Sequence, residues 1–215
     1  LGDWDRHADQ WRFAGVKEED GNWLWKPLPR DRDQAMAHYD GVVMFLARMA
    51  IPSVRRLRPF DDEVGNLTWL TYNARPIDAL FLSQITRERW MEIAHEVRGT
   101  SSDAVIADAM GRWPRDAYAL HGAELETKLR GRRDELVETA ARFFEQVNQN
   151  IDVLGSEKRD QVIVDYPDDG RVRVVLSRKD KRFFEREFIV GETEEVRIYA
   201  LDGDDSLEVR GTPHR

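Results

Sequence analysis

The first eleven residues, LGDWDRHADQW, place three aspartates, a histidine and a glutamine beside two tryptophans. A second acidic cluster, Arg30-Asp31-Arg32-Asp33, follows some twenty residues later. Carboxylate and amide oxygens are the ligands that hard divalent cations prefer, and Mg²⁺ usually binds one or two carboxylates together with water and phosphate. The two clusters therefore predict a site for a divalent metal and a phosphate group.

The stretch between the two clusters is apolar and rich in tryptophan, which predicts a β-hairpin. Its strands would be 11–14 and 23–28, and Asp20-Gly21-Asn22 is typical of the turn between them. Pro27 and Pro29 indicate that the second strand is an edge strand or ends there. One hairpin would bring the two clusters together at its base. Because a natural domain rarely opens on its active site, we also expect the chain to be the tail of a larger protein.

The order of the polar residues matches the needs of phosphoryl transfer. That reaction uses one aspartate to orient or deprotonate the attacking hydroxyl, and side-chain oxygens to hold Mg²⁺ on the nucleotide phosphates. Here Asp5 is followed by Gln10, and the hairpin delivers Asp31 and Asp33. The competing interpretation is an ion-pair network, in which the aspartates of both clusters and the neighbouring arginines only brace the hairpin.

The segment Asp5-Arg6-His7-Ala8-Asp9-Gln10 resembles the catalytic loop of atypical protein-kinase-like enzymes, which in phosphoinositide kinases reads Asp-Arg-His-x-x-Asn. Spore-coat H-type secreted kinases and bacterial toxin kinases carry looser variants. In these families a hairpin follows, with a metal-binding aspartate just beyond it. Pro29-Arg30-Asp31-Arg32-Asp33 is similar to the Trp-Asp-x-Asp segment of the spore-coat H kinases. The resemblance covers about 35 residues and implies the C-lobe of a kinase-like fold.

Carried over by position, the resemblance implies that Asp5 is the catalytic base and that His7 assists the transferred phosphate. Gln10 stands where the family has Asn and would be a metal ligand, with Asp31 or Asp33 as the principal metal aspartate. The cofactors implied are Mg²⁺ or Mn²⁺, and ATP. No glycine-rich phosphate loop and no anchoring lysine on a strand precede this loop in the sequence. We expect either that the missing lobe lies upstream, or that the chain is a kinase-derived module without activity.

A wider resemblance covers most of the chain. The segments GDWDRHADQWR, PRDRDQA and IYALDGDD are similar to a group of long bacterial envelope proteins, where they lie between a calcineurin-like metallophosphatase and a surface-antigen β-barrel. This resemblance implies a location in the extracytoplasmic cell envelope and, as partners, neighbouring domains of one polypeptide. The predicted function is a kinase-like phosphotransferase segment of such a protein. The alternative is a non-enzymatic structural or interaction module.

The composition excludes several classes of protein. A hydrophobic fraction of 41% and a charged fraction of 34% indicate a folded globular chain. The net charge of −8 gives no electrostatic footprint for duplex DNA, so no nucleic-acid partner is expected. The absence of cysteine excludes disulfides, cysteine nucleophiles and thiolate metal sites. No apolar run reaches the ~20 residues of a membrane span.

Helical patterns dominate the middle of the chain. One helix is predicted at about 34–50, with Asp33 as its N-cap and Pro52 as its terminator. In another, at about 87–98, apolar residues recur at helical spacing and indicate a buried stripe made of Trp90, Ile93, Ala94 and Val97. Further helices are predicted near 76–84, after Ser102 as N-cap, and from about 122 to 148.

Two other features have an ordinary explanation. The tryptophans on or beside the hairpin are expected to pack in the core, with a sugar-stacking platform as the alternative; they are Trp4, Trp11, Trp23 and Trp25. The segment Asp202-Gly203-Asp204-Asp205 is similar to Ca²⁺-binding turns of extracellular repeats, but a single copy favours a tight turn between strands.

From Ile151 onward, short runs alternate apolar and polar residues. The runs 162–166, 171–178, 182–190, 195–201 and 206–211 are separated by residues typical of hairpin turns. This pattern predicts a small antiparallel β unit. The predicted fold class is therefore α+β. Residues 1–150 would form a hairpin and a helical bundle like a kinase C-lobe, and residues 151–215 the β module.

Overall fold

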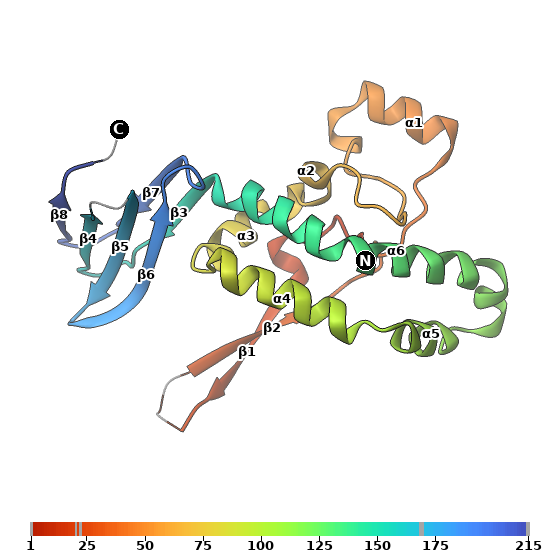
Figure 1. The fold of residues 1–215 in the computed structure, drawn as a ribbon, viewed down its shortest axis with the longest axis horizontal. Helices are drawn as coiled ribbons and strands as arrows, with labels where there is room; N and C mark the ends of the chain where they lie inside the picture. The colour runs from red at the N-terminus through yellow and green to blue at the C-terminus, as the bar shows by residue number, and fades with distance from the viewer. Residues whose placement is uncertain (1, 20, 22, 168–169, 214–215) are drawn as a thin grey trace. The chain divides into compact units, whose positions relative to one another are not determined.

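The structure, a computed structural model, describes residues 2–19, 21, 23–167 and 170–213. It contains both helices and strands, which confirms the α+β class (Figure 1). The chain forms two compact units: residues 1–77 with 93–139, and residues 78–92 with 140–215. Within the described ranges, no helix combines the length and the apolar character needed to cross a membrane.

The first unit begins with the predicted hairpin. Strands β1 (Trp11–Lys17) and β2 (Trp23–Pro29) pair antiparallel, from Trp11 opposite Pro29 to Lys17 opposite Trp23. The expected turn includes residues 20 and 22, which lie outside the described residues. The unit also holds short 3₁₀ turns at Ala8–Gln10, Pro52–Val54 and Tyr72–Ala74, and the helices α1 (Gly41–Ala50), α2 (Leu67–Leu70) and α5 (Asp103–Gly111).

Three helices contribute residues to both units: α3 (Arg75–Leu82), α4 (Arg87–Thr100) and α6 (Arg115–Asn148). In α4 only Ala94 is buried, whereas Ile93 is 37% and Val97 45% exposed, so the predicted buried stripe is wrong for these two residues. Helix α6 begins seven residues earlier than predicted. Proline pre-sets the backbone of a helix start, and the carbonyl of Pro114 accepts a hydrogen bond from Tyr118 N (2.9 Å).

Helix α1 is shorter than predicted. Residues 33–36 form a turn and the helix begins at Gly41, so the prediction of a helix from residue 34 with Asp33 as its N-cap is wrong. Met36 has φ +59°, a left-handed conformation that the interior of a right-handed helix excludes. The carbonyl of Ala37 instead accepts a hydrogen bond from Phe60 N (3.0 Å), a long-range contact that no local pattern encodes.

The core of the first unit is small, and two of its elements remain exposed. Four buried residues form the core cluster: Phe60, Ile106, Met110 and Leu125. Helix α1 has no buried residue, and its Val43 is 80% exposed. On the hairpin, Trp23 is 59% and Trp25 60% exposed, so the expectation that they pack in the core is wrong.

The second unit is built around the β module. Strand order in its larger sheet is β6-β5-β4-β8, and β3 pairs with β7 (Figure 1). The strands are β3 (Asn150–Leu154), β4 (Gln161–Tyr166), β5 (Arg171–Arg178), β6 (Lys181–Ile189), β7 (Glu195–Tyr199) and β8 (Ser206–Gly211). Antiparallel pairing joins β4, β5 and β6 as predicted, whereas β4–β8 and β3–β7 are parallel. Parallel neighbours need long crossover connections, and the alternation of apolar and polar residues along a strand does not indicate which distant strand lies beside it.

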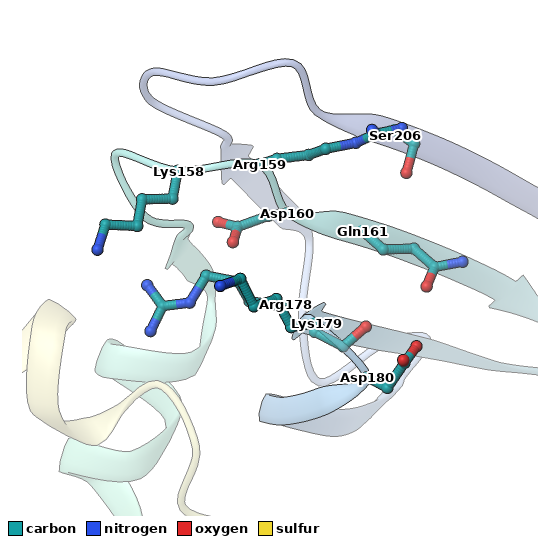
Figure 2. A pocket seen from close by; sticks show the side chains of 9 residues that line it. Lys158, Arg159, Asp160, Gln161, Arg178, Lys179, Asp180 and Ser206 are labelled. Carbon is teal, nitrogen blue, oxygen red and sulfur yellow. The ribbon is translucent and has the colours of Figure 1, made fainter.

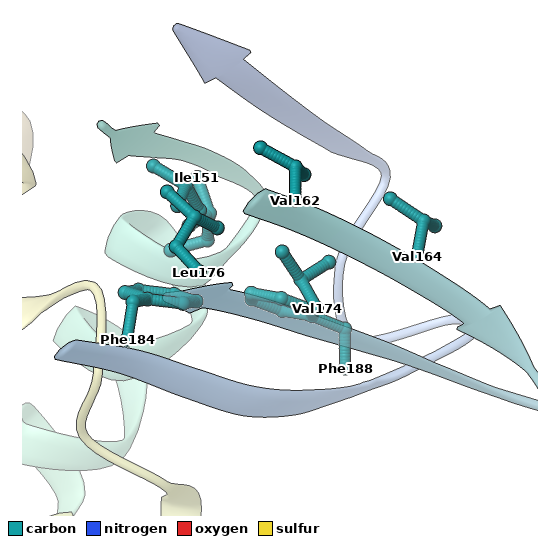
Figure 3. Packing of buried hydrophobic residues seen from close by; sticks show 8 residues of the cluster. Ile151, Val162, Val164, Val174, Leu176, Phe184 and Phe188 are labelled. Carbon is teal, nitrogen blue, oxygen red and sulfur yellow. The ribbon is translucent and has the colours of Figure 1, made fainter. Parts of the chain in front are cut away.

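Alternating residues of adjacent strands build the core of this unit. Figure 3 shows side chains of β4, β5 and β6 that gather on one face of the larger sheet, with Ile151 of β3 packed among them. The buried cluster is Ile151, Val153, Val162, Val164, Val174, Leu176, Phe184 and Phe188. Arg186 shares this face and is only 6% exposed. Its guanidinium donates from Nη1 to Ser83 O (2.6 Å) and from Nη2 to Asn148 Oδ1, so it links β6 to the ends of α3 and α6.

Candidate functional site

The base of the hairpin brings the two acidic clusters together. The 3₁₀ turn Ala8–Gln10 leads directly into β1, and β2 ends at Pro29, opposite Trp11. Main-chain pairing continues beyond this point, because Arg30 N donates to Gln10 O at 2.9 Å. Gln10 and Asp31, which are 21 positions apart in the sequence, become neighbours as a result.

The side chain of Gln10 is buried and faces the segment that follows β2. In one orientation of its amide, Nε2 donates to the carbonyls of Arg30 (2.9 Å) and Asp31 (3.1 Å). The opposite orientation makes a single longer hydrogen bond, from Nε2 to Asp31 Oδ2 at 3.4 Å. The first orientation satisfies more of the buried amide, so we adopt it. Gln10 Oε1 then lies 3.4 Å from Asp31 Oδ2, and two acceptor oxygens face each other.

Asp31 adopts a strained backbone at this position. Its φ of +47° lies in the left-handed region, where aspartate is tolerated but glycine costs less. Its side chain is exposed. Strained residues that are held in place by the surrounding structure cluster at ligand sites.

Asp5 and His7 lie on the segment that precedes the 3₁₀ turn. Asp5 Oδ1 accepts a hydrogen bond from Asn73 Nδ2 (3.0 Å) and lies 3.8 Å from His7 Nε2. Oδ2 of Asp5 has no donor among the residues that the structure describes. The other ring nitrogen of His7, Nδ1, lies 3.9 Å from Asp9 Oδ2. The histidine is therefore placed between two carboxylates.

Asp3 forms a largely buried ion pair of the kind that the bracing network predicts. Its Oδ2 accepts from Arg32 Nη1 (2.9 Å), and its Oδ1 accepts from Asp5 N (3.1 Å). The guanidinium of Arg32 also lies 4.6 Å above the ring of Trp11. This pair connects the N-terminal segment to the chain that follows β2, as the ion-pair interpretation expected.

The side chain of Asp33 does not join the contact between Gln10 and Asp31. Its Oδ2 accepts from Gln34 Nε2 (3.1 Å), and the structure gives it no hydrogen bond to Gln10 or Asp31 within the described chain. Across the same described residues, no group of three or more His, Cys, Asp or Glu side chains is placed to hold a metal ion. Asp5, Asp31 and Asp33 therefore do not form one three-carboxylate cluster. Of the predicted metal ligands, the structure brings Gln10 and Asp31 into contact.

Buried donors without acceptors surround this site. Trp4 Nε1, Trp11 Nε1 and Arg32 Nη2 are inaccessible to solvent and have no hydrogen-bond partner among the residues that the structure describes. An unsatisfied buried donor costs free energy, about 1–3 kcal/mol each. Arg56 Nε, in the guanidinium beside the Trp4 ring, is a fourth donor of this kind, whereas Arg130 Nε and Arg186 Nε belong to other parts of the chain.

Asn73 and Arg56 are site residues that sequence reasoning missed. Asn73 holds Asp5 from 68 positions away, and its Oδ1 accepts from Arg56 Nη1 (3.0 Å). The guanidinium of Arg56 lies 5.1 Å from the Trp4 ring. No local pattern marks either residue, because the contacts depend on how the 3₁₀ turn Tyr72–Ala74 packs against the N-terminal segment.

A hollow of about 240 Å³ adjoins these residues in the first unit. Its lining includes Gly2 and Arg56, together with Arg132 and the carboxylates of Asp61 and Asp62. Burial lowers the pKa of the Arg132 guanidinium, and the nearby carboxylates act in the opposite direction. The hollow is a mixed-charge surface and not a purely cationic one.

The comparisons with known proteins assign no family to this arrangement. No protein-family model, no curated protein and no solved structure matches the chain. The geometry of the hairpin base is therefore the basis for a functional proposal.

Proposed function

We propose that this chain is a segment of a kinase-like phosphotransferase in which Gln10 and Asp31 bind a divalent cation. The observation that carries the proposal is the contact between the buried Gln10 amide and the Asp31 carboxylate; with the amide nitrogen assigned to the carbonyls of Arg30 and Asp31, Gln10 Oε1 lies 3.4 Å from Asp31 Oδ2. Two acceptors repel each other unless a proton or a cation lies between them. The strained backbone of Asp31 adds support, since it orients a carboxylate where glycine would be less strained.

The donor set fits Mg²⁺ or Mn²⁺. Mg²⁺ binds one or two protein carboxylates and completes its shell with water and substrate phosphates. Gln10 offers a buried amide oxygen whose nitrogen is fixed by two carbonyls, and Asp31 offers an exposed carboxylate. When bound with a nucleotide such as ATP, the cation would neutralise charge on the phosphates. We assign the principal role to Asp31, because the carboxylate of Asp33 is held by Gln34.

Asp5 is suited to the role of base. Asn73 fixes one of its oxygens and leaves the other open to a hydroxyl group. Its side chain is 23% exposed, so a substrate can reach it. His7, 41% exposed and 3.8 Å from Asp5, can present a positive charge to a transferred phosphate when it is protonated.

A non-enzymatic interaction module is the second candidate, and the exposed face of the hairpin favours it. Trp23 and Trp25 stack with ring centroids 6.3 Å apart, and a Cβ at Gly15 would lie 3.1 Å from the Trp23 ring. The two rings therefore rest on Gly15 and face outward. Exposed aromatic patches of this kind mark interaction sites more often than isolated surface residues do.

Binding of Mn²⁺ and of Mn²⁺–ATP to the full chain, measured by isothermal titration calorimetry, tests the metal site. Asp31→Asn keeps a residue that tolerates left-handed backbone and removes the charged ligand, so we expect Mn²⁺ affinity to fall about tenfold or more. Asp9→Asn is the matched control. It makes the same charge change on a side chain that is 93% exposed, and Mn²⁺ affinity should not change.

The proposal fails if the natural chain binds no Mn²⁺, or if Asp31→Asn and Asp9→Asn bind it equally well. In that case the interaction module is the remaining candidate. Quenching of tryptophan fluorescence by acrylamide would then be compared before and after adding the neighbouring domains of the natural polypeptide. Protection that disappears in a Trp23→Ser, Trp25→Ser variant would support that candidate.

A further inference from the structure

The second unit contains a cavity that the hairpin site does not explain. It has a volume of about 630 Å³ and lies where the β3–β4 connection, the β5–β6 turn and the start of β8 meet (Figure 2). All nine lining residues are polar or charged. Four of them are cations: Lys158, Arg159, Arg178 and Lys179.

These four cations are exposed and have no carboxylate partner anywhere in the described part of the chain. Other arginines of the same sheet are paired. Arg171 Nη1 lies 2.8 Å from Glu187 Oε2, and Arg210 Nε lies 2.8 Å from Glu208 Oε1. The chain as a whole has a net charge of −8, so an unpaired cationic cluster is a local exception.

The two carboxylates in the lining do not neutralise the cavity. Asp160 is 1% exposed, and its oxygens accept hydrogen bonds from Ser156 N (2.6 Å) and Ser156 Oγ (2.9 Å). That carboxylate is therefore committed to holding its own loop. Asp180 lies on the β5–β6 turn and is exposed. With both carboxylates counted, the lining keeps a net charge of +2.

The turn between β5 and β6 places cations at the rim. Lys179 has φ +48° and Asp180 φ +62°, conformations that two-residue hairpin turns usually give to Asn and Gly. The chain thus keeps a lysine at a position where glycine would be less strained. In Figure 2 the side chains of Lys158 and Arg178 extend toward the side that the Asp160 carboxylate faces, whereas Arg159 extends toward Ser206.

We propose that this cavity binds a small hydrophilic anion that carries two or more phosphate groups. Lys and Arg side chains are the usual ligands of phosphate oxygens, and Arg can bind them in a bidentate manner. The hydroxyl groups of Ser177 and Ser206 supply neutral donors in the same lining. A volume of this size holds an oligophosphate or a phosphorylated sugar. The proposal does not depend on the metal site at the hairpin base.

The lining also decides which part of a ligand it can recognise. It contains no aromatic residue, so it offers no ring on which a nucleobase could stack and only the guanidinium planes of Arg159 and Arg178 could lie against one. Recognition must therefore come from charge and hydrogen bonds. This favours a compact anion such as pyrophosphate over a strand of nucleic acid.

Calorimetric titration of the full chain with pyrophosphate, without divalent cation, tests the proposal. Two double variants remove the lining charges, Lys158→Gln with Arg159→Gln and Arg178→Gln with Lys179→Gln. Each double variant removes side chains that would donate charge-assisted hydrogen bonds to the ligand, so the affinity for pyrophosphate should fall at least about tenfold. The control is Arg171→Gln with Arg210→Gln, which removes the same charge from paired arginines of the same sheet and should leave affinity within about twofold.

Competing ligands separate the remaining explanations. Orthophosphate should bind more weakly than pyrophosphate, and both should weaken as salt rises. The proposal is overturned if the natural chain binds no pyrophosphate at low salt, if the control variant loses as much affinity as the lining variants, or if orthophosphate binds as tightly. Displacement of pyrophosphate by single-stranded oligonucleotides, with affinity that grows with their length, would overturn it in favour of a nucleic-acid surface. All variants change exposed side chains, and circular dichroism verifies that they fold.

Discussion

Replacement of Arg186 tests how the second unit is held together. This residue lies on β6 between Phe184 and Phe188, on the face that builds the core, and is only 6% exposed. It donates to Ser83 O at 2.6 Å and to Asn148 Oδ1, and its guanidinium lies 4.8 Å from the Phe188 ring. Burial lowers the pKa of the Arg186 guanidinium to about 10.

Two opposing effects set the magnitude. A hydrogen bond from a charged donor contributes about 1.5–3 kcal/mol, so the two contribute about 3–6 kcal/mol. The lowered pKa means that burial costs the charged form about 3 kcal/mol. The difference between these two effects is about 0–3 kcal/mol. Arg186→Met keeps an unbranched, apolar side chain but leaves Ser83 O and Asn148 Oδ1 without this donor, so we expect it to lower the free energy of unfolding by about 1–3 kcal/mol. Arg186→Ala also loses packing and should lower it by about 3–5 kcal/mol.

Hydrogen exchange of the peptides that contain β5 and β6 is the suitable assay, because a global melt would mix the two units. Each 1.4 kcal/mol of lost stability should speed exchange of globally protected amides about tenfold. Arg182→Met is the matched control, since it changes an arginine on the same strand that is 56% exposed. If the amides of β5 and β6 exchange as slowly in Arg186→Met as in the natural chain, the two hydrogen bonds do not outweigh the cost of desolvating the guanidinium, and the reasoning is refuted.

Two further predictions concern ion pairs. Arg32→Ala should lower the free energy of unfolding of the first unit by about 2–4 kcal/mol, because it leaves the buried carboxylate of Asp3 without its cation. Adding Asp3→Asn to this variant removes the unpaired charge and should restore part of the hydrogen-exchange protection of β1. If the double variant restores no protection, this explanation is contradicted. In the second unit, the hydrogen bond from Arg173 holds the pKa of the Glu185 carboxyl below its usual 4.5. The ionised carboxylate therefore contributes its full share to the free energy of unfolding above pH 4.5, and this contribution is lost as the pH falls through the lowered pKa. Urea midpoints between about pH 5.5 and pH 3 should therefore fall more steeply in the natural chain than in Glu185→Gln; equal slopes would disprove the coupling.

Local sequence predicted the elements whose stability comes from nearby residues. The hairpin follows from two apolar strands around a turn, and its register from Trp11 to Pro29 sets Gln10 beside Asp31. Ser102 accepts from Val105 N (3.3 Å), as its predicted role at the start of α5 requires. A single turn between two strands and a single helix start create these contacts, so turn and capping residues are enough to predict them.

Distant contacts explain what could not be predicted. The helix expected from residue 34 begins at Gly41, because Ala37 pairs with Phe60 and Met36 turns left-handed. Asn73 donates a hydrogen bond to Asp5, 68 positions away in the sequence, and no sequence pattern around either residue predicts this contact. The roles of Asp5, His7, Gln10 and Asp31 in catalysis or metal binding stay predictions until binding is measured.

Periodicity and turn chemistry act over a few residues, so the α+β class, the hairpin and the alternating faces of the β module could be predicted from the amino-acid sequence. It also placed Arg186 on the same strand face as Phe184 and Phe188, because a strand repeats every two residues. The three-dimensional structure was needed to show that Arg186 is buried against Ser83 and Asn148, and that β8 lies parallel to β4. Strand order and the partners of a buried charge depend on contacts over tens of residues, which local free energies do not encode.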